Sequence, residues 1–290
     1  MQGDYENNSR KDGLMKKALS ISLLCLLMVS CFAMTAFAAE PRAWVGVYID
    51  GVRFDGGVVI KDNTTLVGIR SFAKAMDKNA TVKYDYSTRT LTVSTDKLYL
   101  TAKDGQSYIV ANGRYLYTET PVYMRSGTMY APVLLMAKAF DAKIRWDNPT
   151  SSFYLTKGSG GILSGERFYR EDEVYWLSRI INAESGGEPL TGKIAVGNVI
   201  LNRTRDSYFP STIYGVIFDK KNGVQFSPTQ NGTIYNSPNA QSIIAAKICL
   251  EGYTVNKDIL YFVNASVVPN SWVAKNRPLF AKIGNHSFYY

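Results

Sequence analysis

The sequence predicts an α+β fold in two domains, and three observations support that prediction. Residues 41–157 are rich in Tyr, Thr and Val, with apolar and polar residues alternating as in β-strands. From residue 171 on, apolar residues recur every three or four positions, which indicates helices. A Gly-rich stretch at 158–165 separates the two patterns. We therefore expect a strand-rich tandem α+β repeat at 41–157 and, at 166–290, a mostly helical domain with a small β-sheet.

The first 38 residues match a secretory signal peptide. Lys16 and Lys17 precede an apolar run from Ala18 to Ala36, and Ala36-Phe37-Ala38 fits a small-residue cleavage site. An uncleaved membrane anchor is the alternative, because the run has about the length of a membrane-spanning helix. The Ser, Thr and Cys residues in the run favour cleavage. We predict an exported protein that contacts a membrane only through this segment, before it is removed.

Net charge and cysteine content limit the cellular compartments and the classes of partner that fit this protein. The formal net charge is +9, and removal of residues 1–38, whose own net charge is +1, leaves +8. A basic exported protein is expected to favour anionic partners such as cell-wall polymers, and no nucleic-acid partner is expected. Cys25 and Cys31 lie in the signal segment, so only Cys249 remains and no intrachain disulfide is possible. An exported protein without disulfides suits a Gram-positive type of secretion.

An internal repeat organises residues 41–157. Ala73–Asp77 recurs as Ala137–Asp141, and Tyr84-Asp85 recurs as Trp146-Asp147. Each copy is predicted to hold strands, a short helix and a hairpin. Several tyrosines of this region are able to stack on sugars, although alternating Tyr is also normal strand packing; they are Tyr84, Tyr86, Tyr115, Tyr117 and Tyr123. The Gly-rich residues 158–165 are expected to form a short flexible linker.

The stretch from Tyr169 to Arg205 contains the candidate catalytic residue. Val174, Leu177 and Ile181 have helical spacing, and the next residue on that face is Glu184. The following Ser-Gly-Gly sequence is expected to end the helix, which places Glu184 in its last turn. A carboxylate among apolar side chains near the negative end of a helix dipole should have a raised pKa, as a general acid requires. The alternative is a solvated residue at a helix end.

A second helix is predicted at about 189–205, beginning with Glu188-Pro189. Its residues are apolar on nearly every side, so the helix should be buried. Asn198 and Asn202 are its main polar residues, and their buried amides need hydrogen-bond partners. Those partners are either each other and backbone groups or a ligand, and the structural interpretation is favoured.

Two further helices are expected, at about 211–219 and from Ser237-Pro238 to Gly252. Between them lies the polar, turn-rich segment Lys221–Gly232. A loop of this length inside a compact domain is often a binding loop. Gln225 and Phe226 are its candidate sugar-facing side chains, and the alternative is a solvated loop pinned by one aromatic ring.

The C-terminal tail from Ile259 to Tyr289 indicates a small sheet beside the helices. It carries His286, the one histidine of the chain, and a lone His is more often structural than catalytic. Most zinc peptidase sites need at least two His or Cys ligands, so we expect no metal and no cofactor.

Other hydrolytic chemistries have poor support in the sequence. A Ser/His/Asp triad would use His286, but the sequence has no G-x-S-x-G motif. A Cys/His peptidase would use Cys249, which lies among Ile and Ala in a predicted helix, a poor setting for a thiolate. A single carboxylate remains, although glycosidases ordinarily use two. Candidates for a second one stay open; they are Glu188, Asp206 and Asp219.

Five motifs follow one another in the C-terminal domain: NAESGGEPLTGKIAVGNVILNR, FPSTIYGVIF, QFSP, LYFVN and IGNHSFYY. Together they resemble the catalytic domain of the SleB/CwlJ-type cell wall hydrolases, the spore-cortex-lytic enzyme family, from near Glu171 to the C-terminus. The resemblance implies a lysozyme-like or lytic-transglycosylase-like fold, peptidoglycan glycan strands as the substrate, and Glu184 as the catalytic residue. Tyr261 and Asn264 match motif positions and are expected to bind substrate, together with Gln225, Phe226 and His286.

The repeat at 41–157 resembles the copper amine oxidase N-terminal-like domain. This resemblance implies wall attachment or dimerisation, and a plain α+β spacer is the alternative. No copper is expected, because the segment has no His and no Cys, the ligands that copper prefers.

The expected function is that of an exported cell wall hydrolase in wall or spore-cortex remodelling, during sporulation or germination. A lytic transglycosylase needs one carboxyl group, which protonates the glycosidic oxygen and then accepts the proton of the attacking muramic acid 6-hydroxyl. The resemblance implies cleavage between N-acetylmuramic acid and N-acetylglucosamine. Two alternatives are a hydrolytic muramidase with a second carboxylate and a wall-binding or spore-structural protein without activity.

Overall fold

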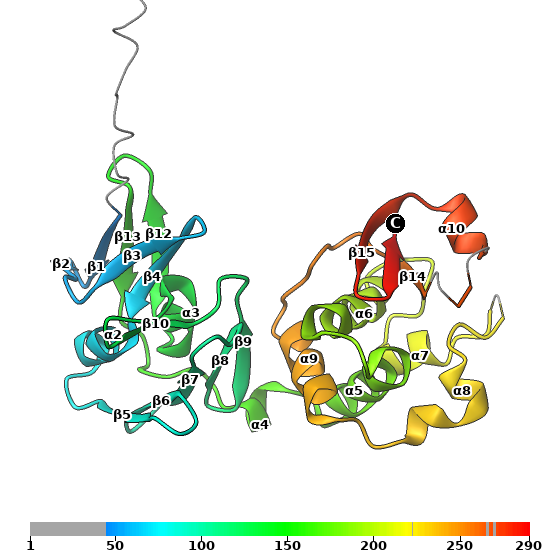
Figure 1. The fold of residues 1–290 in the computed structure, drawn as a ribbon, viewed down its shortest axis with the longest axis horizontal. Coiled ribbons are helices and arrows are strands. Elements are labelled where there is room, and N and C mark those ends of the chain that lie inside the picture. The colour runs from blue at the N-terminus through cyan, green and yellow to red at the C-terminus, as the bar shows by residue number, and fades with distance from the viewer. Residues whose placement is uncertain (1–44, 222, 265–266, 269–270) are drawn as a thin grey trace, which may run out of the picture. The chain divides into compact units, whose positions relative to one another are not determined.

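A computed structural model describes residues 45–221, 223–264, 267–268 and 271–290, and its fold is α+β as the sequence predicts (Figure 1). The signal peptide predicted at residues 1–38 lies outside these described residues. None of the helices in the described part combines the length and apolar character that a membrane span requires. Strands dominate up to Thr156, and helices dominate from Gly165 on.

The predicted internal repeat is confirmed element by element. Each copy consists of a hairpin, a short helix and a second hairpin. The first copy comprises β3 (Val58–Lys61), β4 (Thr64–Gly68), α2 (Ile69–Met76), β5 (Thr81–Asp85) and β6 (Thr90–Ser94). The second copy comprises β10 (Tyr123–Arg125), β11 (Thr128–Pro132), α3 (Val133–Ala139), β12 (Lys143–Asp147) and β13 (Ser152–Thr156).

The two copies share one sheet and extend two others. Their first hairpins join in the order β10-β11-β4-β3, with β11 antiparallel to β4. The hairpin β12–β13 is extended by β1 (Gly46–Ile49), which runs parallel to β13, and by β2 (Val52–Arg53). The hairpin β5–β6 continues into a meander through β7 (Tyr99–Lys103), β8 (Tyr108–Ala111) and β9 (Arg114–Tyr117).

The core of the strand-rich part lies around α2 and α3. The rings of Phe72 and Phe140 meet edge to face with centroids 6.0 Å apart, and both are fully buried. Alternating strand residues such as Leu91, Val93 and Leu100 point into the same core. Aromatic edge contacts and apolar burial therefore hold the two copies together.

The Gly-rich segment predicted as a flexible linker is anchored to the strand-rich part. The Ile162 amide donates to the Ala139 carbonyl at 3.1 Å, and Asn112 Nδ2 donates to the Ile162 carbonyl at 2.8 Å. A Cβ at Gly158 or Gly161 would collide with a backbone carbonyl of a neighbouring segment. These glycines therefore allow close backbone approach, and the segment packs against the strand-rich part.

The helical part contains the four predicted helices. They are α5 (Glu171–Ser185), α6 (Leu190–Arg203), α7 (Ile213–Ile217) and α9 (Ala240–Leu250). Short elements complete it: α4 (Gly165–Phe168), α8 (Pro228–Asn231), the 3-10 helix η1 (Thr233–Tyr235) and α10 (Trp272–Asn276). The segment predicted as a loop at 221–232 thus contains α8, which begins with Pro228 in its first turn and ends at Gly232 in a left-handed conformation.

The predicted small sheet at the C-terminus is confirmed. It consists of β14 (Tyr261–Asn264), β15 (Leu279–Ile283) and β16 (His286–Tyr289) in the order β14-β16-β15. Helices α5, α6 and α9 pack on one another and form the second core of the molecule. Cys249 on α9 is buried in this core, and burial raises the pKa of its thiol, so Cys249 is an ordinary core residue.

A buried carboxylate connects the β8–β9 hairpin to the end of α9. Glu251 accepts two hydrogen bonds from the Arg114 guanidinium, at 2.7 and 2.8 Å. Lys138 Nζ and the Tyr169 hydroxyl each donate to the same carboxylate at 2.9 Å. These charged donors lower the pKa of Glu251 against the cost of its burial, so the carboxylate stays ionised.

Candidate active site

Helix α5 presents Glu184 at the end of a buried stripe. Leu177 and Ile181 are 0% exposed, and Glu184 follows on the same helix face in the last turn of α5. The helix ends at Ser185, as the Ser-Gly-Gly sequence predicts. An apolar stripe that ends in a carboxylate is therefore present.

The carboxyl group of Glu184 is partly buried and without a polar partner. No hydrogen bond or ion pair joins it to another residue among those described. Burial raises its pKa to about 7, because the ionised form loses hydration there. A carboxyl group with this pKa is half protonated near neutral pH and is suited to donate a proton and then accept one.

The backbone around Glu184 is fixed by hydrogen bonds from α9. Asn182 Oδ1 accepts from the Asn239 amide at 3.0 Å and from the Ser242 hydroxyl at 3.2 Å. Asn239 Nδ2 donates to the Gly186 carbonyl at 3.2 Å. Glu184 thus projects from a rigid helix end, as a positioned catalytic group requires.

Glu188, four residues further on, is held by the turn between β15 and β16. The Asn285 amide donates to Oε2 at 2.9 Å, and Asn285 Nδ2 donates to Oε1 at 2.8 Å. The backbone hydrogen bond is the main cause that lowers the pKa of Glu188. At Gly284 a Cβ would collide with Glu188 Oε2, so the turn needs glycine there. Both carboxylate oxygens of Glu188 are therefore engaged in structure.

His286 lies beside Glu188 inside the domain. Its side chain is buried, with Nδ1 3.9 Å from Glu188 Oε1. Burial lowers the pKa of its imidazole, and the Glu188 charge opposes this only in part. The ring meets Phe262 edge to face at 5.4 Å. These surroundings favour the structural interpretation of His286 over contact with a substrate.

The two buried amides of α6 tie down the segment after α9. Asn198 Nδ2 donates to the Tyr253 carbonyl at 2.9 Å, and its Oδ1 accepts from the Val255 amide at 2.8 Å. Asn202 Nδ2 donates to the carbonyls of Asn256 and Ile259 at 3.0 and 2.9 Å. The structural interpretation of this pair is confirmed.

Arg203, which the sequence analysis does not single out, is surrounded by aromatic rings. Its side chain is buried, and its guanidinium carbon lies 4.7 to 5.4 Å from the ring centres of Phe209, Phe226 and Tyr261. Its Nε donates to the Leu260 carbonyl at 2.8 Å. Burial lowers its pKa to about 10. The one signal in the sequence was a charged residue at the end of a helix that is apolar on nearly every side.

Gln225, Phe226 and Tyr261 all adjoin Arg203. Phe226 is 4% exposed and packs in the core, so the expectation that it faces a sugar is wrong. Gln225 Oε1 accepts from Arg203 Nη1 at 3.3 Å, and the Tyr261 hydroxyl accepts from Arg277 Nη2 at 3.0 Å. The polar residues of this segment predicted a loop. They did not predict that its aromatic ring would be buried.

The predicted site residues fall into two groups at opposite ends of α6. Its 14 residues span roughly 21 Å, from the loop that follows Glu184 to Arg203. Gln225, Phe226 and Tyr261 lie at the Arg203 end. Asn264, which is partly buried, is paired with His286 across β14 and β16, and therefore lies at the Glu188 end.

The remaining carboxylates are at the far end of α6 from Glu184. Asp206 follows that end and accepts from the Tyr208 amide at 2.8 Å. Asp219 accepts from the Lys221 amide at 2.9 Å, and its charge acts on Arg203. Paired glycosidase carboxylates are about 5 to 9.5 Å apart, well below the roughly 20 Å length of this helix.

An aromatic cluster lies two turns before Glu184 on α5. Trp176 meets the rings of Tyr214 and Phe218 at 5.2 Å and that of Tyr235 at 6.3 Å. Tyr214 and Tyr235 are exposed. A cavity of about 440 Å³ adjoins Trp176 and Tyr214. These rings come from α5, α7 and η1, and periodicity within one helix does not reveal such a gathering.

The described residues contain no group of three or more His, Cys, Asp or Glu side chains that could hold a metal ion.

Comparison with known proteins agrees with the division seen in the fold. Residues 187–289 match the Cell Wall Hydrolase family, and residues 48–155 match the copper amine oxidase N-terminal domain. The chain contains a cell wall hydrolase domain. The match to this hydrolase domain begins at Gly187, three residues after Glu184.

Curated relatives of the hydrolase domain include spore cortex-lytic enzymes. The protein of that name from Bacillus cereus is 33% identical over 120 residues, which are 41% of this chain and 45% of the relative. The one from Bacillus subtilis is 30% identical over 120 residues, 41% of this chain and 38% of the relative. The chain thus spans less than half the length of these relatives. The cell wall hydrolase CwlJ of Oceanobacillus iheyensis is 28% identical over 111 residues, 36% of this chain and 77% of that protein.

Two solved structures are also similar to the hydrolase domain. The catalytic domain of the germination-specific lytic transglycosylase SleB from Bacillus anthracis is 32% identical, with a TM-score of 0.39. The match covers 44% of this chain and 100% of that one. The catalytic domain of Bacillus cereus SleB is 32% identical, covers 46% and 100%, and has a TM-score of 0.38.

Proposed function

We propose that this chain is an exported peptidoglycan-cleaving enzyme, a lytic transglycosylase with Glu184 as its one catalytic carboxyl group. The observation that carries the proposal is the state of Glu184: a partly buried carboxyl group, without a polar partner among the described residues, whose pKa is raised to about 7. Such a group can serve as acid and then as base in one reaction cycle.

In the proposed reaction the protonated Glu184 gives its proton to the glycosidic oxygen between N-acetylmuramic acid and N-acetylglucosamine. The bond from that oxygen to the anomeric carbon breaks. The 6-hydroxyl oxygen of the same muramic acid then bonds to the anomeric carbon, and its proton passes to the Glu184 carboxylate. The products are a 1,6-anhydro end and a free N-acetylglucosamine hydroxyl, and Glu184 is protonated again.

The positions of the other carboxylates support a mechanism with one carboxyl group. Glu188 is engaged on both oxygens by Asn285, and Asp206 and Asp219 lie at the far end of α6. A hydrolytic muramidase would need one of them as a base for water or as a nucleophile. The intramolecular 6-hydroxyl replaces that requirement.

The relatives support the substrate class and the compartment. Proteins named spore cortex-lytic enzyme and cell wall hydrolase match the hydrolase domain. We infer that this chain acts outside the cytoplasm on peptidoglycan, in spore cortex or vegetative wall. The basic charge of the chain suits a polymer that carries carboxylates.

The test is mass spectrometry of purified cortex and vegetative peptidoglycan digested with the wild type, with Glu184→Gln and with Glu171→Gln. Glu171 lies exposed in the first turn of the same helix and is the matched control. Anhydro-muramic ends from the wild type and from Glu171→Gln, and none from Glu184→Gln, are the expected result. Reducing ends would point to hydrolysis instead. Normal turnover by Glu184→Gln, or no products from the wild type, would overturn the proposal.

A further inference from the structure

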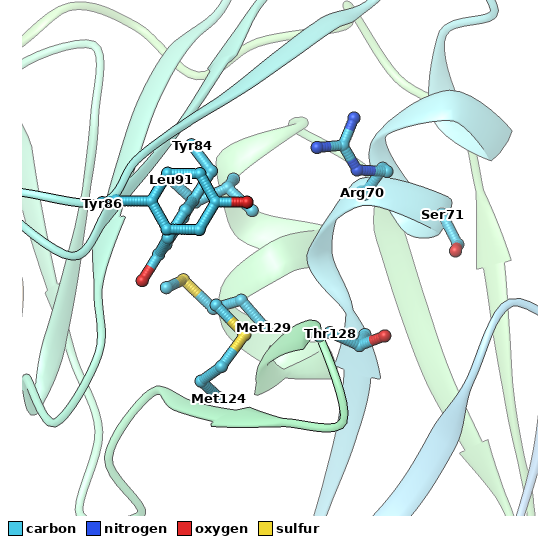
Figure 2. Close-up of a pocket in the computed structure, with 9 residues that line it drawn as sticks. Arg70, Ser71, Tyr84, Tyr86, Leu91, Met124, Thr128 and Met129 are labelled. Carbon is cyan, nitrogen blue, oxygen red and sulfur yellow. The ribbon is translucent and has the colours of Figure 1, made fainter.

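The copper amine oxidase-like repeat contains a cavity of about 310 Å³ that the hydrolase reaction does not use (Figure 2). Three elements line it. The β5–β6 hairpin contributes Tyr84 and Tyr86, α2 contributes Arg70, and the β10–β11 hairpin contributes Met124 and Met129. Its volume lies at the lower end of the range of about 300 to 1,000 Å³ that is typical of small-ligand pockets.

Tyr86 presents an aromatic ring to solvent from a rigid turn. The residue is 87% exposed, and its ring meets Tyr84 edge to face at 4.8 Å. Asp85 fixes the turn by accepting from the Ser87 amide at 2.8 Å and from the Ser87 hydroxyl at 2.6 Å. An exposed ring that projects from a hydrogen-bonded turn can stack on the C–H face of a sugar.

Arg70 adds a positive charge opposite the tyrosines, as Figure 2 shows. Its Nη1 donates to the Val82 carbonyl at 3.2 Å, which orients the guanidinium. Arg70 has no ion-pair partner among the described residues, so its other N–H groups can bind a carboxylate. Leu91 and Met129, both buried, form an apolar floor.

The second copy of the repeat shows that the fold does not require this site. Leu134 occupies the position of Arg70 on α3, and Asn148 that of Tyr86 after β12. Trp146 and Phe153 replace Tyr84 and Leu91, and their rings pack together at 4.7 Å. The second copy folds without the charge and without the exposed Tyr, so this kind of repeat does not need these two side chains in order to fold.

We propose that this cavity binds an acidic N-acetylated amino sugar of the glycan strand. Tyr86 stacks on the sugar ring, Arg70 pairs with the carboxylate, and the floor of Leu91 and Met129 receives the acetamido methyl group. The choice of peptidoglycan as the source rests on the proposed function. A second glycan site on the same chain raises the effective concentration of the hydrolase domain at its polymer.

Methionine methyl NMR of the full chain tests the proposal. All four methionines of the described part, Met76, Met124, Met129 and Met136, lie in the repeat, so their signals report on this domain alone. The probe is the disaccharide of N-acetylglucosamine linked to N-acetylmuramic acid, which lacks the bond that Glu184 is proposed to cut. Diacetylchitobiose, a disaccharide without a carboxylate, is the matched control ligand.

The expected result is a shift of the Met124 and Met129 signals with the acidic disaccharide, while the core residues Met76 and Met136 stay unchanged. Arg70→Leu and Tyr86→Asn introduce the residues of the second copy, and each should weaken binding about tenfold. Tyr99→Ala, which removes an exposed tyrosine outside the cavity, should bind normally.

Three outcomes would overturn this assignment: no shift at Met124 and Met129, equal affinity in Arg70→Leu, or a response only to a glycerol-phosphate teichoic acid. Because the probe is not cleaved, the result is independent of catalysis. Binding without peptidoglycan cleavage would reject the proposed function alone, and cleavage without binding would reject this site alone.

Discussion

Glu188 and Asn285 are joined by two hydrogen bonds, so that the start of α6 and the β15–β16 turn are fixed to each other next to the catalytic candidate. Glu184 and Glu188 therefore differ in protonation, although they are only four residues apart. The pKa of Glu188 is lowered by the Asn285 amide, whereas burial raises the pKa of Glu184 to about 7. One is held as an anion, and the other keeps its proton into the neutral range.

Asn285→Ala should lower the free energy of unfolding by about 1–3 kcal/mol, because Glu188 then stays buried with one of its two donors removed. Urea denaturation at neutral pH measures this. Asn276→Ala is the control, since Asn276 makes one exposed side-chain bond to the Trp272 carbonyl and should cost little. Equal stability of Asn285→Ala and the wild type would show that this pair contributes nothing to the fold.

The helices around Glu184 were predictable because their signals are local. The spacing of Leu177, Ile181 and Glu184, and the Ser-Gly-Gly stop, fix α5 without reference to the rest of the chain. The repeat was predictable for the same reason, since Ala73–Asp77 and Ala137–Asp141 each carry their own turn and helix signals. Burial of Phe226 and His286 was not predictable, because each packs against Phe262 of β14, a residue distant from it in sequence.

The structural roles of several residues depend on tertiary contacts, which the sequence alone does not show. Glycines at 158–161 predict flexibility, but at Gly158 and Gly161 they permit the backbone to pass against Asp141 and Lys97. Arg203 gave no local signal beyond its position, and its aromatic surroundings come from segments distant in sequence. Residues that gather from separate elements are the part of a site that periodicity does not reveal.

The rate of peptidoglycan cleavage should fall as the pH rises through about 7, because Glu184 must carry a proton to start the reaction. Above that pH the rate should drop about tenfold per pH unit. Initial rates of soluble fragment release between pH 5 and 9 measure this, with circular dichroism as a check that the fold persists. A rate that keeps rising above pH 8 would contradict the role of Glu184 as an acid.

The same raised pKa makes a prediction for stability. In the unfolded chain Glu184 ionises at its ordinary pKa of 4.5, but in the folded chain it ionises only near 7. Below about pH 4.5 Glu184 is protonated in both the folded and the unfolded state, so it does not change the free energy of unfolding. As the pH rises from 4.5 toward 7, the folded state loses stability relative to the unfolded one. Above pH 7 the ionised Glu184 lowers the free energy of unfolding by its full amount, on the order of 3 kcal/mol.

Glu184→Gln should therefore be more stable than the wild type at pH 8, and the difference should shrink toward zero at pH 4.5. Urea denaturation at both pH values measures it. Glu171→Gln, at the exposed start of the same helix, should show no such gain, because a carboxylate there stabilises the helix dipole. A pH-independent difference for Glu184→Gln would mean that the carboxyl group is not held in an apolar site.

Gly197 lies where α6 packs tightly against Cys249 of α9 and Ile181 of α5. A Cβ at this position would lie 2.7 Å from Cys249 Sγ and 2.9 Å from Ile181 Cδ1. Gly197→Ala should therefore lower the free energy of unfolding, because overpacking costs about 1–3 kcal/mol and exceeds the gain of about 1 kcal/mol in helix propensity.

Cys249→Ala removes the closer obstacle and should relieve the strain at residue 197. The double variant is expected to be more stable than the sum of the two single effects, by about 0.5–3 kcal/mol. Denaturation of the wild type, both single variants and the double variant completes this cycle. Strictly additive effects would show that Cys249 Sγ does not limit the space at Gly197. The added methyl group would then displace Ile181 instead, whose side chain lies on the same face of α5 as Glu184.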